Sequence, residues 1–134
     1  MSPGRLVLDT SAYSHFRAGH KETLESIAGA DVVHLPTTVL GELYGGFQLG
    51  RQERENRQAL SDFLAEPFVS VLPTTPEVAE QYGRVYAALR RRGRPIPVND
   101  MWIAAAAIDC GGHLVTFDSD FQFVSGLTVS LFDS

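Results

Sequence analysis

Residues 5–11 read Arg5-Leu6-Val7-Leu8-Asp9-Thr10-Ser11, a short apolar run followed at once by a carboxylate and two hydroxyl side chains. A run of this length, rich in Val and Leu and without strict alternation, is typical of a strand buried on both faces of a parallel sheet. Four further runs of the same kind follow along the chain. The five predicted strands are Arg5–Leu8, Val32–Leu35, Phe68–Leu72, His113–Thr116 and Thr128–Phe132.

Helical patterns separate the predicted strands. They lie at Glu22–Ala28, Thr38–Leu49, Arg51–Ala65, Glu77–Arg92 and Asn99–Asp109, and Asn99 is placed to cap the last of them. Strands that alternate with helices predict an α/β fold with a mainly parallel sheet. No stretch has the composition of a linker, so we expect one domain over residues 1–134.

The composition excludes several classes of protein. The chain has 134 residues, 44% of them hydrophobic, which is typical of one folded domain. Cys110 is the only cysteine, which excludes an internal disulfide and argues against structural zinc. No apolar run approaches the roughly 20 residues that span a bilayer, and the segment before Arg5 leaves no room for a secretory signal. We therefore expect a soluble protein of the reducing cytoplasm, with no membrane partner.

The net charge of −5, from 16 acidic and 11 basic residues, is unlike that of a protein that binds duplex DNA. Nucleic acid remains a candidate substrate if bound metal ions supply positive charge locally. The one dense basic patch is either a solvated helix end or a contact for a phosphate backbone. It consists of Arg90, Arg91, Arg92 and Arg94.

Acidic side chains gather at one edge of the predicted sheet. Asp9 directly follows the first strand, Asp118 follows the fourth, and Asp120 comes two residues later. Asp100 opens a helix, and Glu42 lies in the first turns of the helix after the second strand. Because functional groups gather beyond the carboxyl ends of parallel strands, we expect these carboxylates to converge. Taken singly, each is explained as a helix cap or a first-turn acid. Taken together they would repel unless protons or a cation intervene, and oxygen ligands favour Mg²⁺ or Mn²⁺.

Polar side chains beside these carboxylates have two interpretations each. Thr10 and Ser11 either cap the next helix or bind a water or phosphate oxygen. Asn99 is foremost a cap and secondarily a contributor to the site, and Thr116 is either a buried strand residue or one that orients Asp118. The four histidines lack the spacing of paired metal ligands.

Four stretches carry recognisable motifs: Val7-Leu8-Asp9-Thr10-Ser11, Thr38-Val39-Leu40-Gly41-Glu42-Leu43, Pro97-Val98-Asn99-Asp100-Met101-Trp102-Ile103-Ala104-Ala105 and Leu114-Val115-Thr116-Phe117-Asp118-Ser119-Asp120-Phe121. In this order they resemble the PIN-domain family, and most closely the toxins of VapBC-type toxin–antitoxin modules. The resemblance covers nearly the whole chain, and the third and fourth motifs are the specific ones.

The resemblance implies a three-layer sandwich around a five-stranded sheet, and an endoribonuclease that hydrolyses RNA with a metal-activated water. Its catalytic carboxylates would be Asp9, Glu42, Asp100 and Asp118, and all but Glu42 would bind Mg²⁺ or Mn²⁺. The short spacing of Asp118 and Asp120 leaves open which of the two is the direct ligand. The resemblance also implies a homodimer and a VapB-like antitoxin that blocks the cleft.

Two other functions fit parts of the sequence. A haloacid-dehalogenase-like phosphotransfer domain would use Asp9 as its nucleophile, but Ser11 stands where that family has an acid, and Lys21 is the only lysine. A catalytically inactive PIN-like binding module would keep the fold for interaction alone, and the intact acidic set argues against it.

Overall fold

β1 (Arg5–Leu8) lies at the centre of a five-stranded sheet in which all paired strands are parallel. The computed structural model describes residues 3–134. Met1 and Ser2 lie outside the described residues, and they belong to the segment expected to be too short for a secretory signal. β2 (Val32–Pro36) and β4 (His113–Thr116) flank β1, and β3 (Val69–Leu72) and β5 (Thr128–Leu131) form the edges. The five predicted strands are thus present, and the sheet is parallel throughout.

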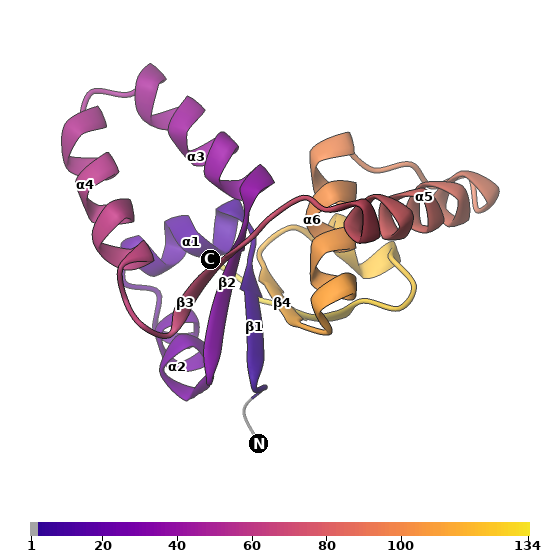
Figure 1. Ribbon diagram of the computed structural model, residues 1–134, viewed down its shortest axis with the longest axis horizontal. Helices are drawn as coiled ribbons and strands as arrows, with labels where there is room; N and C mark the ends of the chain where they lie inside the picture. The colour runs from indigo at the N-terminus through magenta and orange to yellow at the C-terminus, as the bar shows by residue number, and fades with distance from the viewer. Residues whose placement is uncertain (1–2) are drawn as a thin grey trace.

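Helices cover both faces of this sheet. In Figure 1, α5 and α6 lie on one side of the strands, and α1, α2 and α4 lie on the other, which confirms the three-layer α/β sandwich. No helix within residues 3–134 is long and apolar enough to cross a membrane. The helices are α1 (Thr10–Arg17), α2 (Lys21–Gly29), α3 (Thr37–Leu49), α4 (Glu53–Leu64), α5 (Pro76–Arg91), α6 (Val98–Cys110) and the short 3₁₀ helix η1 (Ser119–Phe123).

The structure corrects the sequence prediction in two places. α1 was not predicted, because only Ala12 and Tyr13 of its eight residues are buried and so short a buried face leaves little periodicity. The expectation that every strand is buried on both faces is wrong for the edges. Ser70 and Val71 of β3 are exposed, because an edge strand has a neighbour on one side only.

The turn between α6 and β4 brings the start of α6 and the end of β4 to the same edge of the sheet. Gly111 ends α6 with φ at 67°, in the left-handed region that favours glycine. A Cβ at Gly112 would lie 2.7 Å from Cγ2 of Val7 and 2.9 Å from Sγ of Cys110. Without a side chain at Gly112, α6 can turn back tightly along β4, next to β1.

Candidate functional site

Three carboxylates meet at the edge of the sheet where the strands end. Asp100 comes from the first turn of α6, Asp118 caps η1 just after β4, and Asp120 lies in the first turn of η1. One carboxylate oxygen from each residue lies within 4.8 Å of those of the other two. We call these three residues the carboxylate cluster. At such distances the negative charges repel unless a proton or a cation intervenes.

Asp100 is a buried member of the cluster with a raised pKa. The residue is 9% exposed, and within residues 3–134 no hydrogen-bond donor reaches its carboxylate. Burial and the negative charges of neighbouring carboxylates raise the pKa of Asp100 to about 7. In order of effect, these neighbours are Asp118, Glu42, Asp9 and Asp120. A cation bound here would relieve the repulsion among these carboxylates.

Asp9 is buried beside the cluster and caps α1. Its Oδ1 accepts hydrogen bonds from the N–H of Ala12 (2.8 Å) and from Oγ of Ser11 (2.7 Å), and its Oδ2 accepts one from Oγ1 of Thr116. Burial raises the pKa of Asp9, and these hydrogen bonds oppose the rise. A carboxylate has about four acceptor positions, so one remains free on Oδ2. Asp9 is therefore a helix cap, as expected for this residue taken by itself. One acceptor position of its carboxylate stays free for another ligand.

Glu42 joins three helices through its two carboxylate oxygens. Oε1 accepts from Oγ1 of Thr10 (2.7 Å) and Oε2 accepts from Nδ2 of Asn99 (2.6 Å). The prediction that Asn99 caps its helix is wrong. α6 begins one residue earlier, with Pro97 at the capping position, and the Asn99 side chain is engaged by Glu42 instead.

The turn that carries Asp118 is tied to α1 by two hydroxyl groups. Oγ1 of Thr116, which is fully buried, donates to Asp9 and accepts from the N–H of Asp118 (3.0 Å). Oγ of Ser11 donates to Asp9 and accepts from the N–H of Phe117 (3.1 Å). Asp118 in turn accepts from the N–H of Asp120 (2.9 Å) through its Oδ1. From the sequence, Thr116 and Ser11 are candidate residues of the site. In the structure each hydroxyl group donates one hydrogen bond and accepts another.

The sequence model of the PIN-domain family matches residues 6–127 of this chain. This range includes the whole carboxylate cluster, Asp9 and Glu42. This chain belongs to the PIN-domain family. The family resemblance inferred from the four sequence motifs is therefore confirmed.

Individual PIN-domain proteins are similar over nearly the full length. Ribonuclease VapC5 from Mycobacterium tuberculosis is 28% identical over 125 residues, which is 93% of this chain and 91% of the relative. The crystal structure of VapBC-5 from the same organism matches with 30% identity and a TM-score of 0.75, covering 98% of this chain and all of that one. VapBC2 from Rickettsia felis, bound to a promoter DNA fragment, has a TM-score of 0.85 at 21% identity and covers 96% and 99% of the two chains. These similarities confirm that the chain resembles the VapC proteins.

The basic patch of this PIN domain packs in part against its own chain. Nη1 of Arg92 donates to the carbonyl of Phe123 (2.6 Å), and the guanidinium of Arg94 lies 3.7 Å from the centre of the Phe123 ring. Arg90 lies over the ring of Tyr86, 5.0 Å from its centre. The contacts of Arg92 and Arg94 fix the end of α5 against η1, whereas Arg90 packs on its own helix. Contact of these arginines, and of Arg91, with RNA stays a prediction.

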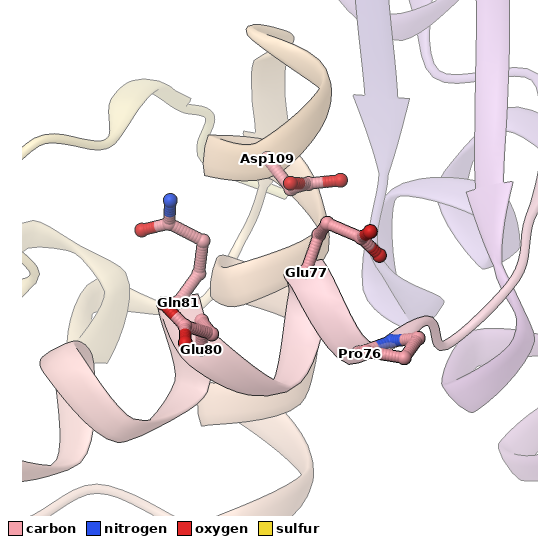
Figure 2. A pocket seen from close by; sticks show the side chains of 5 residues that line it. All are labelled: Pro76, Glu77, Glu80, Gln81 and Asp109. Carbon is pink, nitrogen blue, oxygen red and sulfur yellow. The ribbon is translucent and has the colours of Figure 1, made fainter.

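A second acidic hollow lies apart from the carboxylate cluster and shares no residue with it. Figure 2 shows Asp109 from the last turn of α6 above Glu77 and Glu80 from the first turns of α5. Pro76 and Gln81 complete its lining. Within residues 3–134 these acids do not form a group of three that could hold a metal ion. Glu77 is therefore a matched control for substitutions in the cluster.

Proposed function

We propose that this PIN domain, one domain over residues 1–134, is a Mg²⁺- or Mn²⁺-dependent endoribonuclease and the toxin of a type II toxin–antitoxin pair. The observation that carries the proposal is the carboxylate cluster, in which Asp100 is buried without a hydrogen-bond donor among the residues described and has its pKa raised to about 7. Similarity to proteins named as VapC ribonucleases supports RNA as the substrate.

The donor set of the cluster fits a hard divalent cation. Asp100, Asp118 and Asp120 offer carboxylate oxygens alone, and such ligands suit Mg²⁺ and Mn²⁺ better than zinc. Both Asp118 and Asp120 are in this group, so we assign a ligand role to each, and the free position on Asp9 is consistent with its predicted role as a further ligand. When bound, the cation would supply positive charge for the phosphodiester and lower the pKa of the attacking water.

The remaining polar residues hold the charged groups in place. Thr116 and Ser11 fix Asp9 and the turn that carries Asp118. Thr10 and Asn99 fix Glu42, whose negative charge helps to raise the pKa of Asp100. Loss of such supporting hydrogen bonds around a metal site typically lowers metal affinity or activity about 10-fold to 100-fold.

A VapB-like antitoxin is the proposed protein partner, supported by the likeness to chains from VapBC structures. Clustered carboxylates attract an Arg or Lys side chain, which would compete with a metal ion for the same oxygens. We expect the antitoxin to insert such a residue near Asp9 and Asp100. A complex in which the cluster stays open would contradict this expectation. The homodimer and the cytoplasmic location stay predictions.

The alternative of phosphotransfer requires a reactive carboxylate at Asp9. This residue is 4% exposed and three donors bind its oxygens, which disfavours attack on an incoming phosphate. Trapping of an aspartyl-phosphate would favour that alternative. Failure to bind a divalent metal would favour the binding module without catalysis.

The test is cleavage of structured and unstructured RNAs by the purified protein in Mg²⁺, in Mn²⁺ and in EDTA, with mapping of the product ends. We expect cleavage that EDTA abolishes, with 5′-phosphate and 3′-hydroxyl ends. Asp118→Asn should lose activity, whereas Glu77→Gln, which removes a carboxylate from the other acidic hollow, should keep it. Robust cleavage in EDTA would contradict the proposal.

A further inference from the structure

The imidazole of His15 is held against the segment of chain that leads into the carboxylate cluster. His15 lies on α1, and its ring stacks on that of Phe117 with 3.7 Å between ring centres and 11° between ring planes. Phe117 stands between Thr116 and Asp118 in the chain, so the ring on which His15 stacks belongs to the residue directly before a member of the cluster. This placement could not be predicted from the sequence, since residues 15 and 117 are far apart in the chain.

Contacts on several sides give this ring one orientation. Nδ1 of His15 lies 2.8 Å from the backbone carbonyl of Ser11. The side chain of the same Ser11 binds the N–H of Phe117 and the carboxylate of Asp9, so the ring shares a frame with the site. The ring of His20 meets both aromatic partners edge-on, at 5.7 Å from His15 and 4.9 Å from Phe117.

This geometry fixes the chemical character of the other ring nitrogen. A carbonyl oxygen can only accept, so Nδ1 of His15 must donate to Ser11. In the neutral ring Nε2 then carries the lone pair and is an acceptor. Nε2 has no hydrogen-bond partner among residues 3–134, and the side chain is half-buried rather than buried. The neutral ring therefore presents a fixed acceptor that no residue among 3–134 uses.

An acceptor suits only some groups of a nucleic acid. Phosphate oxygens are acceptors themselves and do not pair with it. The 2′-hydroxyl of ribose is a donor that recurs along RNA and is missing from DNA. We propose that Nε2 of His15 accepts a hydrogen bond from a 2′-hydroxyl next to the scissile phosphate and thereby favours RNA over DNA. This inference rests on the proposed ribonuclease function, and it makes His15 a substrate-binding residue.

The experiment combines substrate and protein substitutions. A cleaved RNA oligonucleotide is prepared with a single 2′-deoxy nucleotide at each position around the cleavage site. Wild type should lose kcat/KM roughly 3-fold to 10-fold at one position, as expected for one hydrogen bond. His15→Asn keeps an amide N–H where Nδ1 donates but has no atom at Nε2. This variant should lose a similar factor on the all-RNA substrate and be indifferent to the deoxy substitution at that position.

Control variants separate this role from folding. His113→Asn changes a histidine at the other end of β4, whose Nε2 pairs with Oγ of Ser130, and should keep the wild-type sensitivity. If His15→Asn melts far below wild type, His15→Gln replaces it, because its amide oxygen restores an acceptor near Nε2 and should keep part of the sensitivity.

Three results would overturn the inference. The first is a deoxy sensitivity in His15→Asn equal to that of wild type. The second is a wild type that is insensitive at every position. The third is equal loss of affinity for RNA and DNA in His15→Asn, which would indicate a phosphate contact. Absence of cleavage of the all-RNA substrate by wild type would instead refute the proposed ribonuclease function.

Discussion

Replacement of Asp100 by Asn tests the electrostatics of the carboxylate cluster. The pKa of Asp100 is raised from the ordinary 3.8 to about 7, first by burial and then by the charge of Asp118. A folded-state pKa above the unfolded value means that the folded protein prefers the protonated acid, so stability falls as the pH rises through the folded pKa. About 3 pKa units at 1.36 kcal/mol each give an upper limit of about 4 kcal/mol for this loss.

Asp100→Asn keeps the volume of the side chain but cannot ionise. In EDTA the variant should therefore exceed wild type in free energy of unfolding by up to about 4 kcal/mol at pH 8 and by little at pH 4. In Mg²⁺ at pH 8 wild type should gain stability, because a ligand that binds only the folded state adds free energy by mass action. The variant should lose most of that gain.

Urea unfolding at pH 4 and pH 8, each in EDTA and in Mg²⁺, measures four free energies of unfolding for each of the two proteins. Glu77→Gln is the matched control and should follow wild type throughout. If Asp100→Asn is less stable than wild type in EDTA at pH 8, Asp100 supports the fold rather than straining it. A gain of the same size at both pH values would show that ionisation is not its cause.

Three further substitutions test single contacts of the structure. Both ring nitrogens of His34 are buried and have no hydrogen-bond partner among residues 3–134, and burial lowers the pKa of this ring. Wild type should therefore lose stability as the pH falls below about 6.5, and His34→Leu should be more stable and lose less. Melts at pH 5 and pH 7 measure these losses, and equal losses in both proteins would contradict the reasoning. Thr116→Val should lower the free energy of unfolding by about 1–3 kcal/mol at pH 7 and by less at pH 4, because the buried carboxylate of Asp9 loses a hydrogen-bond donor. Urea unfolding measures this loss, and a loss of the same size at both pH values would argue against this cause. Asn99→Ala should lower the rate of RNA cleavage about 10-fold to 100-fold with little change in the melting temperature, because Glu42 loses a hydrogen bond. Full activity of this variant would show that Asn99 does not support the site.

The strands and most helices could be predicted because their signals are local. β1 and β4 have the predicted bounds, and their apolar runs are continuous because the central strands are covered on both faces. The placement of Asp100 and Asp118 at one edge followed from a general property of parallel sheets. Neither inference needed a contact between distant parts of the chain.

The errors and omissions concern contacts that depend on distant residues. Asn99 has the composition of a cap, and only the fold brings Glu42, 57 residues away, to its side chain. The stacking of His15 on Phe117 depends on the packing of α1 against the end of β4 in the same way. The burial of Asp100, which sets its pKa, is likewise a property of the folded surroundings and not of its neighbours in sequence.

Binding of Mn²⁺ to the purified protein, measured by electron paramagnetic resonance without RNA, tests most directly the claim that the carboxylate cluster is a metal site. The account predicts saturable binding to wild type and to Glu77→Gln, and at least about 10-fold weaker binding to Asp118→Asn, which removes a charged oxygen ligand from the cluster. Equal binding by wild type and Asp118→Asn, or loss of binding in Glu77→Gln alone, would contradict it.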